Sequence, residues 1–435
     1  MNTLTKTQEL LARQRKVMLP VVSDMLLHGD NPIAFSHGKD QWLFDIEGNK
    51  YLDFFGGILT VSVGHANDEI TDATIEQLKK LQHTSMLYLN ETAIELAEKL
   101  AEITPKKLQQ SFLSNSGTEA NETAIMAARN YTGNTDIIAL RHAYSGRSST
   151  AMSITAHSHW KQGHVYDGTI KHVKNPYRYR FPLEVTDEEY MDFLVDDLKE
   201  MIRTCTTGKI AAFMAEPIQG VGGFIVPPLD YFKRILPIVR EAGGLLIIDE
   251  VQTGWGRTGK HMCAINHWDV EPDIMVFAKG IANGAPSGAT IMTPDVAASV
   301  STTLCTFGGN PVTSATALAT INYIQSNNLV DNAEKQGKVL RAALENMKQA
   351  NDFIGDVRGM GLMQAFEMVK PDGSKTPDVE KANQFVDAAR ERGLLLGKGG
   401  LYGNTIRIAP HLNLKSDDLD SAINIMQDSL SVITH

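Results

Sequence analysis

Cysteine is scarce in this sequence, and its scarcity excludes two kinds of protein. Among the 435 residues there are only three cysteines, Cys205, Cys263 and Cys305, which lie far apart and form no C-x-x-C pair. This spacing supports neither a disulfide framework nor a cysteine zinc site. We therefore expect a reducing compartment, the cytoplasm, and no metal centre.

Long apolar runs and an excess of positive charge are missing as well. No apolar stretch approaches the ~18 residues that a membrane-spanning helix needs, and residues 1–20 are typical of an amphipathic helix rather than of a signal peptide. The 51 acidic residues outnumber the 41 basic ones, which gives a net charge of −10. Because nucleic acids and anionic membranes attract basic proteins, the composition predicts neither kind of partner.

The sequence otherwise has the composition of an ordinary folded protein, with 43% hydrophobic and 21% charged residues. Its length corresponds to two or three domains, or to one large α/β domain with a smaller companion. The 35 glycines are close to the average share, so their positions are more informative than their number.

Uninterrupted apolar stretches recur along the middle of the chain. Six of them are separated by helical or loop segments, and they lie at residues 111–114, 136–140, 210–215, 245–249, 274–278 and 289–292. Strands that are apolar on both faces are typical of a mostly parallel sheet covered by helices. The pattern predicts an α/β fold.

The two ends of the chain follow other patterns. Residues 41–56 predict a β-hairpin around a Glu-Gly-Asn turn. Residues from 331 onward predict a smaller α+β unit, with helices at 331–350, 376–392 and 416–430 and strand-like segments at 353–367 and 405–408.

The stretch 157–190 is irregular and rich in His, Tyr and Arg, which predicts a long surface insertion near a site. Its histidines raise the alternatives of a metal or a nucleic-acid site; they are His157, His159, His164 and His172. Their irregular spacing and the acidic net charge favour a solvated loop that lines the site's entrance.

The first motif that could carry chemistry runs from Asn115 to Glu122, where a predicted strand turns into an Ala-rich helix. The first N–H groups of such a helix, with the hydroxyls of Ser116 and Thr118, can bind an anion such as phosphate. The S-x-x-E spacing of Ser116 and Glu119 is equally explained by a capping box. The motif alone leaves both interpretations open.

The second motif is Asp249, which ends a fully apolar strand. A carboxylate there is costly to bury without a cationic partner, and ligands of open α/β sheets bind at the carboxyl ends of strands. Residues 254–259 match the nucleotide-binding pattern G-x-G-x-x-G. The match is weak, because four residues separate it from the strand and no clean amphipathic helix follows.

The third motif is Lys279, which follows another apolar strand and precedes Gly280. Desolvation there would lower the pKa of the amine and make it nucleophilic, although a surface lysine explains the residue as well. Residues 306–311, TFGGNP, form a glycine turn before a helix and by themselves predict only a loop. The order of anion site, Asp249 and Lys279 is what pyridoxal phosphate requires, because its phosphate, ring nitrogen and aldehyde need these three partners.

At this point the sequence resembles the class III, or ω-amino-acid, aminotransferases of pyridoxal-phosphate fold type I. The matches occur in order and span essentially the whole chain: YLDFFGGI (51–58), NSGTEAN (115–121), AYSGR (143–147), AEPIQG (215–220), DEVQTGWGRTGK (249–260), FAKGIANG (277–284), TFGGNP (306–311) and GLLLGKGGLYGNTIRIAP (393–410).

The resemblance implies how the cofactor is held. Lys279 would form the Schiff base, and Asp249 would pair with the ring nitrogen. The other implied contacts are Ser116, Gly117 and Thr118 with the phosphate, Tyr144 stacked on the ring, Val251 under its face, Gln252 on the phenolic oxygen, and Glu216 in support. Thr306 would reach the phosphate of the other subunit, which implies a homodimer with shared sites, or a tetramer of such dimers.

The resemblance also implies the architecture. We expect a large cofactor-binding domain at residues 68–330, with a mostly parallel sheet of the seven-stranded type between helices. A small α+β domain would be built from both chain ends, residues 1–67 and 331–435.

One departure bears on the substrate. Many family members carry Glu directly after the IQG motif, where it masks the arginine of the IRIAP motif, whereas this chain has Val221. Arg407 is thus the candidate anchor for a substrate carboxylate, unless it is a structural arginine paired elsewhere. Phe55 and Gly57, with Phe54 and Gly56, are candidates for the pocket wall, although they could simply end a strand.

The segments IQGVGGFIVPP, NPYRYRFP and GLLLGKGGLYGN are similar to the alanine-glyoxylate aminotransferase 2-like branch. We expect amino transfer from alanine, β-alanine, 3-aminoisobutyrate or a similar donor to pyruvate or glyoxylate, with pyridoxamine phosphate formed in between. The alternatives are a 2-oxoglutarate-dependent enzyme of the GABA, ornithine or taurine type, and a lyase on the same fold.

Overall fold

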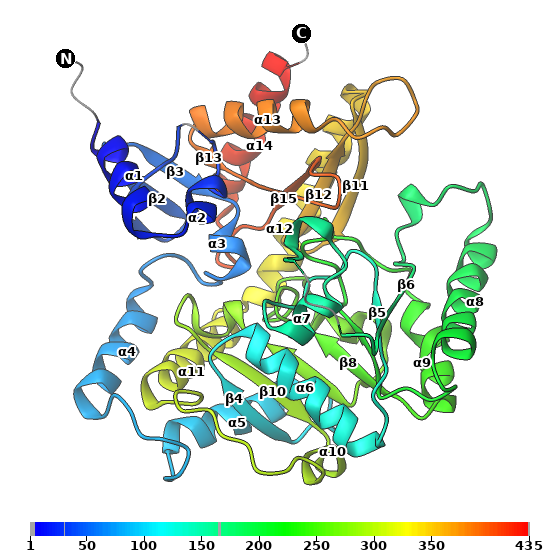
Figure 1. The fold of residues 1–435 in the computed structure, drawn as a ribbon. Coiled ribbons are helices and arrows are strands. Elements are labelled where there is room, and N and C mark those ends of the chain that lie inside the picture. Colours follow the sequence, from blue (N-terminus) through cyan, green and yellow to red (C-terminus); the bar gives the residue numbers. More distant parts are fainter. Residues whose placement is uncertain (1–4, 30, 164–166, 434–435) are drawn as a thin grey trace.

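A seven-stranded sheet forms the centre of the molecule (Figure 1). The computed structural model describes residues 5–29, 31–163 and 167–433. In spatial order the strands are β4 (Gln110–Ser114), β10 (Gly288–Met292), β9 (Ile274–Phe277), β8 (Leu245–Asp249), β7 (Ala212–Ala215), β5 (Ile137–Leu140) and β6 (Ile170–Val173). Only β10 is antiparallel to its neighbours, so the predicted α/β class and the mostly parallel sheet are confirmed.

The strands are apolar throughout because both faces of this sheet are buried. In β8, Ile247 packs in one core with Ala124 of helix α6 (Gly117–Thr132), whereas Ile248 packs in the core on the opposite face with Phe232 of α9 (Tyr231–Glu241). Successive side chains of a strand point to opposite faces, so a strand covered on both sides needs apolar residues at every position.

Further helices surround the sheet. They are α4 (Asp68–Lys80), α5 (Glu91–Ile103), α7 (Ser149–Ile154), α8 (Asp187–Cys205), α10 (Pro294–Ala298) and α11 (Pro311–Ser326), with short 3-10 turns at Ser158–Trp160, Arg178–Arg180, Ala264–Trp268 and Lys279–Ala282. The helix that carries the anion motif, α6, is rich in alanine, which lets its axis lie close to the strands beneath it.

Both chain ends meet in a second, smaller region, at the top of Figure 1. The N-terminal part contributes α1 (Lys6–Val17), α2 (Pro20–Asp24), β1 (Phe35–Lys39), β2 (Trp42–Asp45), β3 (Lys50–Asp53) and the turn α3 (Gly56–Leu59). The C-terminal part contributes α12 (Leu329–Ala350), β11 (Ile354–Met360), β12 (Met363–Met368), α13 (Val379–Glu391), β13 (Leu394–Leu395), β14 (Gly397–Gly399), β15 (Thr405–Ile408) and α14 (Ser416–Ile433). Strand β13 pairs with β3, which joins the two ends in one sheet.

The structure corrects two expectations from the sequence. The stretch 157–190 is not a solvated insertion throughout, because it contains β6, the edge strand of the large sheet, and because His157 is buried and contacts the carbonyl oxygen of Gly400. His164 lies outside the described residues. The strand-like segment 353–367 is two strands, β11 and β12, paired across a tight turn. The boundaries at 67/68 and 330/331 stay predictions.

Within the described parts of the chain, we find no helix with the length and apolarity needed to span a membrane.

Candidate active site

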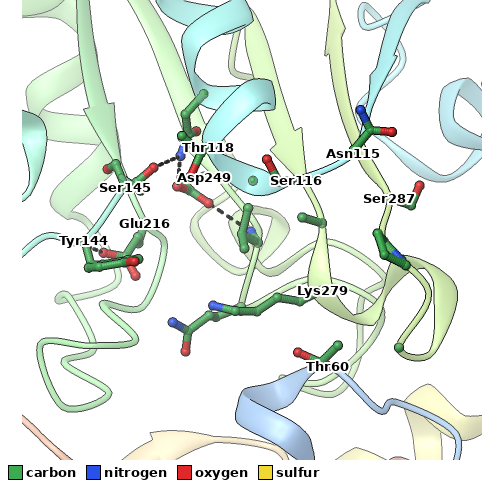
Figure 2. Close-up of a pocket in the computed structure, with 18 of the residues that line it drawn as sticks. Thr60, Asn115, Ser116, Thr118, Tyr144, Ser145, Glu216, Asp249, Lys279 and Ser287 are labelled. Atoms are coloured by element: carbon green, nitrogen blue, oxygen red, sulfur yellow. Dashed lines mark hydrogen bonds between the residues drawn. The ribbon is translucent and has the colours of Figure 1, made fainter. Parts of the chain in front are cut away.

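A cavity of about 280 Å³ opens where the parallel strands end (Figure 2). Its lining comes from the residues that follow β4, β5, β7, β8 and β9, together with Thr60 and the turn before β10. The sequence-predicted residues in the lining are Ser116, Gly117, Thr118, Tyr144, Glu216, Asp249, Val251, Gln252 and Lys279. Segments as far apart in sequence as those of Ser116 and Lys279 thus converge because parallel strands end at one edge.

One wall of the cavity is the N-terminus of α6. The Ser116 hydroxyl accepts a hydrogen bond from the N–H of Glu119 at 3.2 Å, while the Glu119 carboxylate accepts one from the N–H of Asn115 at 2.7 Å. The capping interpretation is therefore correct for Ser116. It does not displace the anion interpretation, because the first N–H groups of any helix lack intrahelical partners, and Gly117 and Thr118 line the cavity.

Asp249 is buried at the centre of the site. Its Oδ2 accepts a hydrogen bond from Nδ2 of Asn121 at 2.9 Å, and its Oδ1 accepts one from the N–H of Val251 at 3.0 Å. Burial raises the pKa of this carboxyl, whereas the two hydrogen bonds and the charge of Lys279 lower it. Because these two hydrogen bonds fix its orientation, the carboxylate can pair with a cation placed in the cavity.

Lys279 extends between Asp249 and Thr60 in Figure 2. Its backbone has φ of 47°, in the left-handed region that non-glycine residues rarely adopt. Burial lowers the pKa of its amine to about 8, against the opposing attraction of Asp249 and Glu216. A larger fraction of the amine is therefore neutral and nucleophilic near pH 7 than for an exposed lysine.

Glu216 supports the site from the end of β7. Its carboxyl accepts hydrogen bonds from the N–H of Gly220 at 2.8 Å and from the N–H of Tyr144 at 3.3 Å. Burial raises its pKa to about 8, and the neighbouring charge of Asp249 acts in the same direction. Glu216 therefore holds a proton around pH 7 and fixes the backbone on which Tyr144 lies.

Arg407 lies on β15, outside the lining of this cavity. Its side chain donates to the carbonyl oxygens of Lys398 at 3.1 Å and Gly220 at 3.4 Å, and its guanidinium carbon is 5.0 Å from the ring centre of Phe55. Its Nε is buried without a hydrogen-bond partner, and within the described ranges no carboxylate forms an ion pair with it. A guanidinium held in this way can still donate hydrogen bonds to an anion.

The other sequence candidates lie elsewhere. The sequence makes Phe54 a candidate for the pocket wall, and this expectation is wrong. Phe54 is fully buried in the hydrophobic core. Gly57 lies at the exposed outer part of the turn α3, and Thr306 is exposed and does not line the cavity of its own chain. The G-x-G-x-x-G residues 254–259 form a buried turn that packs against α12, as expected for a match without nucleotide function.

Sequence reasoning missed several residues of the site. Asn121 belongs to the motif NSGTEAN, but the motif by itself does not indicate what its side chain binds. The signal is its spacing of four from Gly117, which places both residues on one face of α6. Thr60 and Ser287 also line the cavity. No local signal marked these two, because only the tertiary fold brings their segments to the strand ends.

Comparison with known proteins identifies the family to which this site belongs. The family model for class III aminotransferases matches residues 27–430. The chain belongs to the class III aminotransferases. It is 41% identical over 402 residues to the mitochondrial alanine-glyoxylate aminotransferase 2 homolog 2 of Arabidopsis thaliana, a match that covers 92% of this chain and 83% of the relative.

Solved structures of this aminotransferase family share the whole fold. A thermostable (S)-enantioselective ω-transaminase from Thermomicrobium roseum superposes with a TM-score of 0.91 at 32% identity, covering 100% of both chains. A phospholyase from Arthrobacter, solved with phosphoethanolamine, gives a TM-score of 0.90 at 31% identity, covering 97% of this chain and 99% of the other. Fold type I is thereby confirmed, and one fold carries more than one reaction.

The aminotransferase uses pyridoxal 5′-phosphate, as its family and the cofactor-bound transaminases among its structural neighbours do. The described residues fit this group. Oε1 of Gln252 is buried in the cavity lining without a partner, and therefore needs a donor. A Cβ on Gly117 would lie only 3.2 Å from Val251, so the glycine keeps the space before the helix open for a phosphate.

Proposed function

We propose that this aminotransferase moves an amino group from alanine, β-alanine, 3-aminoisobutyrate or a similar donor to pyruvate or glyoxylate. The observation that carries the proposal is the buried guanidinium of Arg407, whose Nε has no hydrogen-bond partner in the described chain. The name of the Arabidopsis relative, an alanine-glyoxylate aminotransferase homolog, agrees with substrates of this size and charge.

The charges around Arg407 favour a carboxylate ligand. Glu216 is near enough to influence the pKa of Arg407, but burial raises the pKa of Glu216 to about 8, which disfavours its charged form at neutral pH. Val221, after the IQG motif, brings no carboxylate either. A substrate carboxylate would therefore supply the charge that Arg407 lacks, in the bidentate geometry that a guanidinium favours.

We assign the reaction itself to two residues. Bound pyridoxal phosphate supplies an electron sink for the bond that is broken at the donor's amine-bearing carbon. The carboxylate of Asp249 holds a positive charge on the ring nitrogen, and the amine of Lys279 removes and returns the proton at the donor carbon as general base and acid. Ser116, Gly117 and Thr118 would hold the phosphate, Tyr144 and Val251 would cover the ring, and Gln252 would bind the phenolic oxygen.

We also propose a homodimer in which Thr306 of each chain completes the phosphate site of the other. Support comes from an apolar surface formed by Leu87, Tyr88, Leu89 and Phe307, whose exposed fractions are 74%, 72%, 94% and 60%. The ring of His83 lies 5.3 Å from that of Phe307, which joins the two segments of this surface beside Thr306. An apolar patch of this kind marks an interface.

The proposed reaction is tested with substrate panels. Each donor is first mixed with the holoenzyme without acceptor, and the absorbance of the bound cofactor is followed; each acceptor is then added to the aminated enzyme. We expect alanine or a small ω-amino acid as donor and pyruvate or glyoxylate as the best acceptor. A large preference for 2-oxoglutarate would overturn the acceptor assignment, and product formation without consumption of any 2-oxo acid would indicate a lyase instead.

A further inference from the structure

The turn α3 beside the cavity has an unusual backbone. Four consecutive residues have positive φ: 58° at Gly56, 59° at Gly57, 66° at Ile58 and 58° at Leu59. Glycine adopts this left-handed conformation readily, but leucine and above all the β-branched isoleucine do so at an energetic cost. Such strain persists only where the surrounding structure holds the backbone in place, and it concentrates at functional sites.

The beginning of the turn is held by Asp53, at the end of β3. Its Oδ1 accepts hydrogen bonds from the N–H groups of Phe55 and Gly56, both at 2.9 Å. Asp53 is buried, so no water replaces these bonds. Hydrogen bonds to a buried carboxylate are among the stronger ones in proteins.

The other oxygen of Asp53 is held by histidine. Oδ2 lies 2.8 Å from Nε2 of His65 and 3.7 Å from Nε2 of His411. His411 also contacts the carbonyl oxygen of Val61 through Nδ1 at 2.7 Å, just after the turn ends. Burial acts to raise the pKa of Asp53, but the hydrogen bonds from His65 and from the N–H of Phe55, together with the neighbouring His411, outweigh it, so the pKa is lowered. The carboxylate therefore stays ionised and binds the beginning of the turn, while His411, beside its other oxygen, contacts the residue that follows the end.

The residues that flank this turn adjoin Arg407 and the cavity: Thr60 belongs to the cavity lining, whereas Phe55 does not. Phe55 lies against Arg407, the candidate carboxylate anchor, with 5.0 Å between ring centre and guanidinium carbon. Thr60, at the other end, lines the cavity and lies next to Lys279 in Figure 2. A change in the turn would move both residues without touching Asp249 or the N-terminus of α6.

We propose that Asp53, supported by His65 and His411, is a positioning residue for substrate: it holds the strained turn so that Phe55 and Thr60 shape the donor and acceptor subsite. The candidate cofactor residues follow strands of the large sheet, whereas the turn follows β3 of the small one. The proposal rests on the proposed function, in which Arg407, outside the cavity lining, anchors a substrate carboxylate. It assigns to Asp53 an effect on substrate binding rather than on cofactor binding.

The test compares Asp53→Ala and Asp53→Asn with a matched control. Asp45 is a buried aspartate of the same small sheet, and it also accepts two backbone N–H bonds, from Glu47 at 3.0 Å and Asn49 at 2.7 Å. Its turn is remote from the cavity lining. For each holoenzyme, the apparent Kd of the donor and the limiting rate of the half-reaction are measured, together with Tm and cofactor affinity.

We expect Asp53→Ala to raise the donor's apparent Kd about 10-fold or more, with a limiting rate and a cofactor affinity within about threefold of wild type. Asp53→Asn keeps one acceptor oxygen and is expected to restore most of the affinity. Asp45→Ala and Asp45→Asn should lower Tm without raising Kd. Equal effects of the Asp53 and Asp45 variants on Kd, or a limiting rate that falls as much as Kd rises, would overturn the positioning role.

These outcomes are separable from the proposed substrates. The donor used is the best one found for the wild type, so a failure of alanine in the wild-type half-reaction refutes the donor assignment and leaves the Asp53 comparison intact. If Asp53→Ala does not fold, Asp53→Asn and His65→Ala provide the same comparison, because His65→Ala removes the bond to Oδ2, with the ring contact to His411, and leaves the two backbone bonds to Oδ1.

Discussion

Nδ2 of Asn121 donates a hydrogen bond to Oδ2 of Asp249 at 2.9 Å and a second one, also at 2.9 Å, to the carbonyl oxygen of Ser145. Through this amide, helix α6 fixes both the carboxylate at the end of β8 and the loop after β5. Oδ1 of Asn121 is buried without a partner. The amide is therefore oriented by its two donor bonds, and the bond to Asp249 also stabilises the negative charge of that carboxylate.

We expect Asn121→Leu to slow transamination about 10- to 100-fold. The substitution keeps the volume but removes a hydrogen bond to a buried carboxylate, worth about 1.5–3 kcal/mol, so the charge opposite the ring nitrogen is less stable. Steady-state kcat of the cofactor-saturated enzyme measures the effect. Asn134→Leu is the control, because Asn134 bonds the carbonyl oxygen of Ile210 away from the cavity. Unchanged kcat in Asn121→Leu would refute the role of this bond.

The lowered pKa of Lys279 predicts the pH dependence of cofactor attachment. Attack on an aldehyde requires the neutral amine, and the neutral fraction rises as the pH passes the pKa, here about 8. The rate at which the apoenzyme binds the cofactor covalently should therefore increase from pH 6 and level off above about pH 9. Borohydride trapping followed by mass spectrometry measures it, with Lys279→Ala as the blank. A midpoint near 10.5, as for an exposed lysine, would show that burial does not tune this amine.

A substitution at Gly220 tests whether the side-chain amide of Gln252 contacts the cofactor. A Cβ at position 220 would collide with the side-chain amide of Gln252, so Gly220→Ala must displace that amide from the cavity. We expect the cofactor's Kd to rise about 10-fold, the loss of roughly one hydrogen bond. Gly244→Ala is an equally crowded control at the far end of the sheet, where the added methyl meets Ile210. Cofactor titration of the apoenzymes gives both values, and equal Kd values would exclude a contact from Gln252.

The proposed dimer predicts that one charge at its interface separates the chains. Leu89→Glu places a carboxylate in the apolar surface of Leu87, Tyr88, Leu89 and Phe307, and burying an unpaired charge is costly. We expect a monomer in analytical ultracentrifugation, and weaker cofactor binding because Thr306 is withdrawn. Leu183→Glu, at an exposed leucine outside this surface, should leave the mass unchanged. A wild-type monomer would contradict the proposal directly.

The strands that hold the cofactor could be predicted because their environment leaves a local mark. Strand β8 is buried on both faces, so all its positions before Asp249 are apolar, and the polar residue at its end is conspicuous. Strand β6 escaped prediction because it lies at the sheet edge, where only Ile170 and Val173 are buried and Lys171 and His172 are partly exposed. Its four residues carry no alternation or apolar run.

The turn at residues 56–59 could not be predicted for a different reason. The pair Gly56 and Gly57 predicts a sharp bend of the backbone. Ile58 and Leu59, in contrast, are residue types that rarely adopt positive φ. They lie between the contacts of Gly56 with Asp53 and of Val61 with His411, the latter 350 residues along the chain. Local propensity does not contain constraints of that range, and the contact between Arg407 and Phe55 was hidden in the same way.

The contact of Arg407 with Phe55 gives the sharpest test of substrate recognition. Arg407→Gln keeps hydrogen-bond donors but removes the charge, so binding of a substrate carboxylate should weaken about 10- to 100-fold, as for a hydrogen-bonded charge pair of about 1.5–3 kcal/mol. We expect KM for pyruvate or glyoxylate to rise by that factor, whereas the half-reaction with a simple amine that lacks a carboxylate should keep its rate.

Arg257→Gln is an informative control, since Arg257 is also buried but donates to the carbonyl oxygens of Leu362 and Pro410. It should reduce stability without separating the two donor classes. Equal losses for acids and simple amines in Arg407→Gln would make Arg407 a structural residue.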